Sequence, residues 1–340
     1  YIVTSSSSSP VAGATVTISA QLADANDNPV ATSGQTVTWT KSDANGSFAS
    51  ATSTTNASGI ATVVFTSHTV SGTATTVTAT TSAISGTSAS ITTVAGTASK
   101  YIVTSSSSSP AAGGTVTISA QLADANNNPV STSGQTVTWT KSDANGSFAS
   151  ATSTTNASGI ATVVFTTHTV VATATTVTAT TSAISGTSAS ITTVAGTASK
   201  YIVTSSSSSP AAGGTVTISA QLADANNNPV STSGQTVTWT KSDANGSFAT
   251  ATSTTNASGI ATVVFTSHTV SGTATTVTAT TSAISGTSAS ITTVAGTASK
   301  YIVTSSSSSP VAGATVTISA QLADANDNPV ATSGQTVTWT

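Results

Sequence analysis

The sequence has no cysteine and no methionine, and charged residues make up only 4% of its 340 positions. Without cysteine it has no disulfide, no thiolate metal site and no cysteine nucleophile. Its basic residues are too few to form a stripe that neutralises phosphates, so nucleic acid is not an expected partner. The apolar runs, such as residues 63–65, are far too short to cross a bilayer, and we expect no membrane insertion of this segment.

Glutamate and arginine are absent as well, and aromatic residues make up only 4%. Threonine, serine, alanine and valine dominate instead. Threonine and valine are β-branched and fit the pleated surface of a strand, whereas strong helix formers other than alanine are scarce. The composition therefore predicts an all-β protein.

The sequence repeats itself every 100 residues. Residues 1–100 recur with seven differences at 101–200, a third copy follows at 201–300, and a fourth begins at Tyr301. This period is the usual size of one domain, so the pattern predicts an array of domains. An array of near-identical copies is typical of a tether or fibre, because copying a domain adds length.

The boundaries between copies leave little room for a linker. Residues 93–101 contain no proline and a single glycine, so the last strand of one domain is expected to run almost directly into the next domain. We therefore expect a stiff rod. The domains are predicted at 1–97, 98–197 and 198–297, with the first three strands of an incomplete fourth domain at 298–340, a window on a longer array.

Apolar and polar residues alternate over short segments within each copy. In residues 15–22, Val16, Ile18 and Leu22 share one face, and the opposite face is wholly polar. Seven or eight such segments predict a β-sandwich, with Trp39 as the largest contribution to its core. The strands are expected at or near 1–4, 15–22, 35–40, 60–66, 75–81 and 88–94, with short segments near Phe48 and at 53–55.

Four segments carry a resemblance to a known family: residues 23–30, 36–39, 54–63 and 95–103. Together they resemble the group 1 bacterial immunoglobulin-like domains of the invasin and intimin type. The resemblance spans the whole repeat and recurs in every full copy. It implies tandem immunoglobulin-like β-sandwiches in the stalks of bacterial surface adhesins, with related arrays in archaea. It also implies an extracellular or cell-surface location and no catalysis.

Asp24, Asn26 and Asn28 have the spacing with which a calcium-binding loop begins. The glycine that should follow is missing, and the sequence has no glutamate to close the coordination shell. Asp27, within the same segment, becomes asparagine in the next two copies. We therefore predict a turn whose side chains bond the local backbone, with calcium between neighbouring domains as the alternative.

His68 and Lys41, each with its counterparts in the other full copies, are the remaining candidates for a catalytic or covalent role. No nucleophile elbow or oxyanion turn accompanies His68, so the sequence predicts a surface histidine and not a catalytic one. Lys41 shares the inward parity of Trp39. We favour an ion pair at the sandwich rim, near Asp24 or Asp43, or a lysine that lays its stem along the rim and keeps its ammonium in water, over a covalent lysine–asparagine crosslink. We expect no catalytic residue, no cofactor and no metal site.

Two further patterns concern the surface. The sequons Asn45-Gly46-Ser47 and Asn56-Ala57-Ser58 lie on predicted turns and make Asn45 and Asn56, with their copies, candidate N-glycosylation acceptors. Rows of outward threonine, as at 36–40 and 76–80, raise the question of ice binding. Because the rows occur on several strands instead of one flat face, we favour ordinary exposed strand residues.

These features favour a non-enzymatic structural array. It forms an extracellular fibre or the stalk of a cell-surface adhesin, and it acts through reach and stiffness. The expected partners are an anchor and tip domains outside this sequence, and other copies of the chain, since so few charges oppose side-by-side association. The alternative is a multivalent binding module in which each repeat carries a weak site for a carbohydrate, calcium or a host protein.

Overall fold

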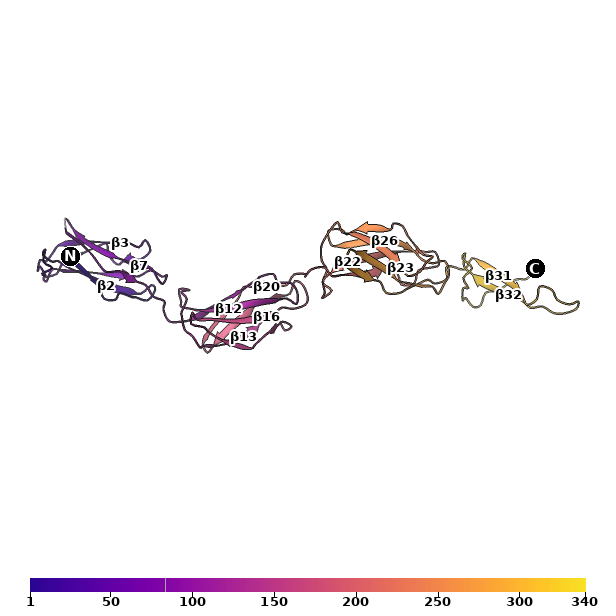
Figure 1. Cartoon of the computed structure of the whole chain (residues 1–340), viewed down its shortest axis with the longest axis horizontal. Helices are drawn as coiled ribbons and strands as arrows, with labels where there is room; N and C mark the ends of the chain where they lie inside the picture. The colour runs from indigo at the N-terminus through magenta and orange to yellow at the C-terminus, as the bar shows by residue number, and fades with distance from the viewer. Residues whose placement is uncertain (83) are drawn as a thin grey trace. The chain divides into compact units, whose positions relative to one another are not determined.

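The computed structural model describes residues 1–82 and 84–340, and every regular element in them is a β-strand. In Figure 1 the strands of each copy form a group of their own, with β31 and β32 of the fourth copy in yellow. None of the described residues belongs to a helix that is long and apolar enough to span a membrane. These elements agree with the all-β prediction.

The strand bounds recur with the period of the sequence. The first copy has β1 (Ile2–Ser5), β2 (Thr15–Gln21), β3 (Thr36–Lys41), β4 (Ser47–Phe48), β5 (Thr52–Thr54), β6 (Ile60–Thr66), β7 (Ala74–Thr75), β8 (Val77–Thr81), β9 (Ile84–Thr87) and β10 (Ile91–Thr92). The second has β11 (Lys100–Ser105), β12 (Thr115–Ala123), β13 (Thr136–Lys141), β14 (Ser147–Phe148), β15 (Thr152–Thr154), β16 (Ile160–Thr166), β17 (Ala174–Thr175), β18 (Val177–Thr181), β19 (Ile184–Thr187) and β20 (Ile191–Thr192). The third has β21 (Lys200–Ser205), β22 (Thr215–Ala223), β23 (Thr236–Lys241), β24 (Ser247–Phe248), β25 (Thr252–Thr254), β26 (Ile260–Thr266), β27 (Ala274–Thr275), β28 (Val277–Thr281), β29 (Ile284–Thr287) and β30 (Ile291–Thr292). The fourth has β31 (Lys300–Ser305) and β32 (Ile318–Ala323).

By its internal contacts the chain divides into two compact units. The first comprises Tyr1–Pro110, Gly114–His168 and Thr173–Thr192, and the second comprises Ala111–Gly113, Thr169–Ala172 and Thr193–Thr340. The first unit therefore holds the first copy and most of the second. The two short segments of the second copy that belong to the second unit are turns that contact residues of the third copy.

Each full copy is a sandwich of two antiparallel sheets. In the first copy the strand orders are β1-β2-β6-β4 and β5-β3-β8-β9, with β7 and β10 as a short extra pair. The inward residues of both sheets form one core, in which Ile18, Val37 and Val77 are fully buried. This topology confirms the tandem immunoglobulin-like β-sandwich predicted from the alternation of apolar residues.

The segment between β1 and β2 has pairing partners of its own. β1 pairs with β2 of one sheet, and beyond the serine run of residues 5–9 Val11 forms a parallel bridge with Val94. The N–H groups of Thr92 and Val94 donate to the carbonyls of Ser8 and Pro10. The serine run thus connects two short pairings and is not a linker between domains.

Aromatic side chains fill the centre of the core. Trp139 is 4% exposed, and its indole N–H donates to the Ser153 hydroxyl at 3.0 Å. Phe165 is fully buried against the tilted ring of Phe148, with 5.1 Å between the ring centroids. A Cβ atom at Gly146 would lie 2.4 Å from the ring of Phe165, so this turn requires glycine.

Trp139→Ala should be the most damaging single truncation in the second copy. Loss of the buried indole is expected to lower the free energy of unfolding by about 3–5 kcal/mol. Calorimetry of the full chain would then show one repeat melting below the others. Trp339→Ala is the matched control, because Trp339 is 56% exposed. Equal melting curves for the two variants would contradict the assignment of Trp139 to the core.

Candidate functional site

Residues 124–128 form a turn between β12 and β13. The Oδ1 atom of Asp124 accepts the backbone N–H groups of Asn126 and Asn128, each at 2.9 Å. Asn127 has a φ of 69°, a left-handed conformation that asparagine and aspartate adopt more readily than other side chains. This is the turn that the spacing of Asp24, Asn26 and Asn28 predicts in the first copy.

The second carboxylate oxygen of Asp124 reaches the preceding copy. Oδ2 accepts the backbone N–H of Gly96 at 2.8 Å and the side-chain amide of Asn128 at 2.9 Å. Each oxygen therefore has two N–H donors. Burial alone would raise the pKa of Asp124, but the hydrogen bonds from Asn128, Gly96 and Asn126 outweigh it and lower the pKa to about 2. The carboxylate stays ionised inside the contact between two copies.

The two asparagines complete this contact. Asn128 donates from Nδ2 to the carbonyl of Thr69 at 2.9 Å and accepts the N–H of Ser71 at 2.8 Å. Asn126 donates to the carbonyl of Ala12 at 3.1 Å. We call this set of hydrogen bonds, together with the one from Gly96 to Asp124, the junction.

The segment that enters the second copy is also attached to it. Ser99 donates its N–H to the carbonyl of Ala123 at 2.9 Å, and the ammonium of Lys100 donates to the carbonyl of Ala125 at 3.1 Å. Together with the bond from Gly96 to Asp124, three hydrogen bonds join residues 96–100 to residues 123–125.

The second unit contains the same bonds. Around Asp224 they join Gly196 to Asp224 (2.9 Å), Asn226 to Ala112 (2.9 Å), Asn228 to Thr169 (2.9 Å) and Val171 to Asn228 (3.1 Å). Around Asp324 they join Gly296 to Asp324 (2.7 Å), Asn326 to Ala212 (3.1 Å), Asn328 to Thr269 (2.8 Å) and Ser271 to Asn328 (2.7 Å). The junction is therefore a property of the repeat.

The first copy of the turn gives an internal comparison. Asp24 and Asn28 are exposed, whereas Asp124 and Asn128 are 2% and 4% exposed, although the surrounding sequence differs only at Asp27 and Ala31 and their counterparts. Asp24 keeps its bonds to Asn26 and Asn28 within the turn. Contact with a preceding copy is thus what buries these side chains.

The side-chain oxygens that would coordinate calcium in the alternative interpretation accept hydrogen bonds from N–H groups in this arrangement. Both oxygens of Asp124 and the amide oxygen of Asn128 accept hydrogen bonds. Among the described residues no three aspartate or histidine side chains gather into a metal-binding group. The geometry fits a junction between domains, and the spacing motif serves as its turn.

Sequence reasoning found the turn but missed its partners. Gly96, Thr69, Ser71 and Ala12 contribute backbone groups, which leave no side-chain pattern in the sequence. Gly96 is the one position with a visible signal, as the single glycine of the boundary segment. A Cβ there would lie 3.2 Å from the side chain of Val11.

The junction turn at residues 69–72 differs between copies. The first and third have Ser-Gly where the second has Val171-Ala172. Gly72 and Gly272 have φ values of 81° and 82°, and Ala172 is held in the same region at 58°. A left-handed alanine costs about 1–2 kcal/mol, so this turn is strained in the second copy.

Lys41 and His68 both lie near Asp43 in the first copy. Lys41 is half-buried, and its ammonium donates to the carbonyl oxygen of Asp43. The predicted ion pair with the Asp43 carboxylate is not what forms, since those oxygens accept the N–H groups of Asn45 and Gly46. His68 is half-buried and not simply on the surface, with Nδ1 accepting the N–H of Val70 at 2.7 Å.

Both predicted glycan acceptors are exposed. Asn56 uses Oδ1 to accept the N–H groups of Ser58 and Ile60, at 2.9 and 3.1 Å, which leaves its Nδ2 atom at the surface. Asn45 lies on the turn before β4. Glycosylation at these positions stays a prediction.

Outward threonines of β3, β5 and β8 lie side by side on one sheet. Thr38 of β3 pairs with Thr52 of β5 on one side and Thr80 of β8 on the other. The next row continues to β9, where the hydroxyls of Thr78 and Thr87 bond each other at 2.8 Å. The sheet of a sandwich is twisted, however, so this face is not a flat lattice.

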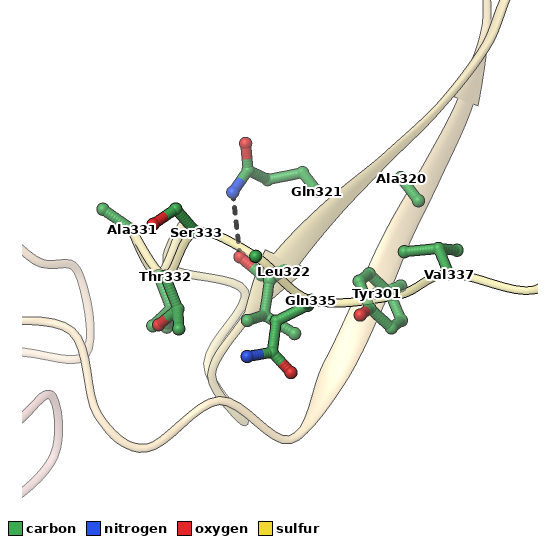
Figure 2. Close-up of a pocket in the computed structure, with 11 residues that line it drawn as sticks. Tyr301, Ala320, Gln321, Leu322, Ala331, Thr332, Ser333, Gln335 and Val337 are labelled. Carbon is green, nitrogen blue, oxygen red and sulfur yellow. Dashed lines mark hydrogen bonds between the residues drawn. The ribbon is translucent and has the colours of Figure 1, made fainter.

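A hollow of about 480 Å³ lies in the fourth copy (Figure 2). Tyr301, Leu322, Gln335 and Val337 surround it, and Gln321 donates to the carbonyl of Leu322 at 3.0 Å. The equivalent residues of the second copy are covered by β18 and β19, which reduce the space to about 330 Å³. Its lining is that of a sandwich core, with no aspartate, lysine or histidine among the residues.

Comparison with solved structures returns proteins that include bacterial adhesins. The Escherichia coli adhesin FdeC is 18% identical over 86% of this chain and 96% of its own, with a TM-score of 0.43. Invasin, a bacterial integrin-binding protein, is 19% identical over 89% of this chain and 62% of its own, with a TM-score of 0.39. Yersinia pseudotuberculosis InvD is 18% identical over 82% and 92%, with a TM-score of 0.38.

No protein-family model and no curated protein matches the sequence.

Asp124→Asn is expected to flatten the acid dependence of stability. The lowered pKa means that Asp124 contributes its full stabilisation above the ordinary aspartate value near 3.9, and loses it as the pH falls from about 4 towards 2. Thermal unfolding of the native chain between pH 5 and 2 should therefore fall more steeply than that of the variant. Asp27→Asn is the control, because Asp27 is exposed and asparagine replaces it in the next two copies. Parallel curves for the native chain and Asp124→Asn would rule out the ionised junction.

Ala172→Gly is expected to stabilise the chain by about 1 kcal/mol through relief of the left-handed alanine. The reciprocal change, Gly272→Ala in the third copy, should destabilise it by a similar amount. Calorimetry of both variants measures the effect. Unchanged melting in both would show that the turn is not strained.

Proposed function

We propose that this chain is a non-enzymatic structural array, the stalk of a cell-surface adhesin or the shaft of an extracellular fibre. Its location is then outside the cell or at its surface. The observation that carries the proposal is the junction, in which the buried side chains of Asp124 and Asn128 bind the backbone of the preceding copy. These side chains are used for holding domains together.

The junction supports a role that depends on stiffness. A flexible connection between domains is long and rich in glycine and serine, and it forms few bonds with either domain. Here residues 96–100 are bonded to the turn that follows β12, and Asn126 and Asn128 bind two further segments of the first copy. Three separated points of attachment restrict both bending and rotation at the junction.

The charge distribution supports association of copies in the fibre form of the proposal. Residues 100–199 contain two lysines, Lys100 and Lys141, and two aspartates, Asp124 and Asp143, so their formal charges cancel. The third copy has the same balance. Neutral repeats do not repel one another, so other copies of the chain are suitable lateral partners, with an anchor and tip domains as partners at the ends.

The alternative of a multivalent binding module has less support. Exposed aromatic side chains are the usual contacts of a weak carbohydrate or protein site. Tyr1 is half-buried, and its hydroxyl bonds that of Thr81 at 2.8 Å. Tyr101 and Tyr201 are each 4% exposed. Within the described residues the complete repeats present no exposed aromatic cluster.

Asn128→Ala tests the junction. The variant loses the bonds to Thr69 and Ser71, and the first two copies should move more freely. Because the chain has no cysteine, Thr62→Cys and Thr162→Cys, both exposed, place one spin label on each copy without competing sites. Pulsed electron paramagnetic resonance then measures the distance distribution between the labels, which is expected to be narrow in the parent and broad in the variant.

Asn28→Ala is the matched control, because Asn28 is exposed and its side chain bonds only its own turn. It should leave the distance distribution narrow. A broad distribution in the parent chain itself would overturn the proposed stiff array.

A further inference from the structure

A histidine holds the part of the first copy that Asn128 binds. His68 precedes Thr69, whose carbonyl is one junction partner, and Nδ1 of its ring accepts the N–H of Val70 at 2.7 Å. The carbonyl of His68 accepts the N–H of Gly13 at 3.0 Å, which ties the turn to the segment before β2. Val70 lies between the two junction groups, Thr69 and Ser71, so its hydrogen bond fixes the turn that presents them.

The second unit has the same arrangement around His268. Its Nδ1 atom accepts the N–H of Val270 at 2.7 Å, and its carbonyl accepts the N–H of Gly213 at 3.0 Å. In this unit Nε2 of His268 also lies 3.0 Å from Nδ2 of Asn245. The nitrogen and oxygen of an amide exchange places when it turns over, and the Asn245 oxygen can then accept the Nε2 proton. The two turns therefore agree in the bond that matters for the junction.

This bond requires a neutral ring. A neutral imidazole accepts through one nitrogen and donates through the other, so acceptance at Nδ1 places the ring proton on Nε2. The imidazolium carries a proton on both nitrogens and accepts nothing. Protonation would set two N–H groups against each other at 2.7 Å, which breaks the bond between His68 and Val70.

Few charged groups face the ring. Asp43, on the turn after β3, has a lowered pKa chiefly because it accepts the Asn45 N–H, and the charges of His68 and Lys41 lower it further. β2, β6 and residues 67–72 contain no other titratable side chain. Across the junction, Asp124 is ionised throughout the range in which histidine titrates.

We propose that His68 and His268 are proton-sensitive positioning residues of the junction. The neutral ring holds the turn that binds the next copy, and protonation releases it. Once Val70 loses its acceptor, the Thr69 carbonyl and the Ser71 N–H no longer meet Asn128 together. The inference rests on the proposed function, because it concerns regulation of the same junction, and it makes an array that stiffens or loosens as the pH crosses the histidine range.

The test uses the full chain with spin labels at Thr62→Cys and Thr162→Cys, measured at pH 8 and pH 5. Histidine side chains ordinarily titrate near pH 6.5, between these values. The distance distribution should be narrow at pH 8 and broad at pH 5, with about a fivefold rise in the open population, the equilibrium value of one net hydrogen bond. The acid titration of Asp124 lies below this range and does not contribute.

His68→Asn is the matched variant. An asparagine side chain also accepts the N–H two residues further on, but it does not titrate. The variant should therefore stay narrow at both pH values. His268→Asn leaves the first junction unaltered and should respond to pH as the parent does.

The outcomes separate the two proposals. A parent that is narrow at both pH values overturns the role of His68 and leaves the stiff array standing. A parent that is broad at both pH values overturns the stiff array itself. A His68→Asn variant that broadens at pH 5 like the parent shows that another group titrates, and it also overturns the role of His68.

Nitrogen NMR of the histidine-labelled chain gives an independent measurement if the variant disturbs the turn. The His68 signals, assigned by comparison with His68→Asn and His268→Asn, should show Nδ1 as an acceptor and Nε2 protonated at pH 8. The Val70 amide proton should shift with the same midpoint as the ring. An Nδ1–H tautomer at pH 8 would contradict the proposal.

Discussion

A buried carboxylate has to be surrounded by donors, and this requirement organises the junction. An ionised group removed from water is unstable by several kcal/mol unless it is paired or hydrogen-bonded. Asp124 obtains three of its four donors from its own turn and the fourth from Gly96 of the preceding copy. The turn is therefore preorganised, and docking of the preceding copy completes a shell that already exists. The turn around Asp24 has the same internal bonds.

Because the donors come from one copy and the copy before it, the stability of each copy depends on its own fold and on its contacts with its neighbours. In such arrays stability is approximately the sum of the domain terms and the terms for neighbouring contacts. The copies are nearly identical, so differences between junctions come from a few positions. Val171-Ala172 is the clearest case, because the alanine takes a glycine conformation while Val171 still donates to Asn228, at 3.1 Å compared with 2.8 Å for Ser71 and Asn128. Substitution at the turn thus tunes one junction without touching a core.

The local pattern of apolar and polar residues was enough to predict the β-sandwich fold of each copy. It was not enough to predict the contact between copies. The alternation in residues 15–22 and 60–66 gave the correct inward faces, since burial in a two-layer sandwich follows the side-chain period of a strand. The turn at Asp24 followed from the tendency of aspartate and asparagine to bond their own backbone. Its partners lie 28 to 114 residues away in sequence and act through N–H and carbonyl groups that every residue carries. Only the topology, which brings residues 12, 69–71 and 96 to one end of the sandwich, identifies them. The same reason hid the role of His68, whose local bond becomes meaningful only because Thr69 and Ser71 are used by the next copy.

The scarcity of charge then acquires a structural meaning. The lysines, aspartates and histidine of a copy lie in turns or at the first or last residue of a strand, as Lys41 and Lys100 do, and the faces of both sheets are uncharged. A change of proton concentration therefore has almost nothing to act on within a sandwich. It acts at the ends of the domains, where Asp43, His68 and Asp124 lie near the segments through which neighbouring copies contact each other. The free energy that titration supplies is therefore confined to the junction. An array whose cores do not respond to pH, but whose contacts between domains do, can change its bending without the unfolding of any domain.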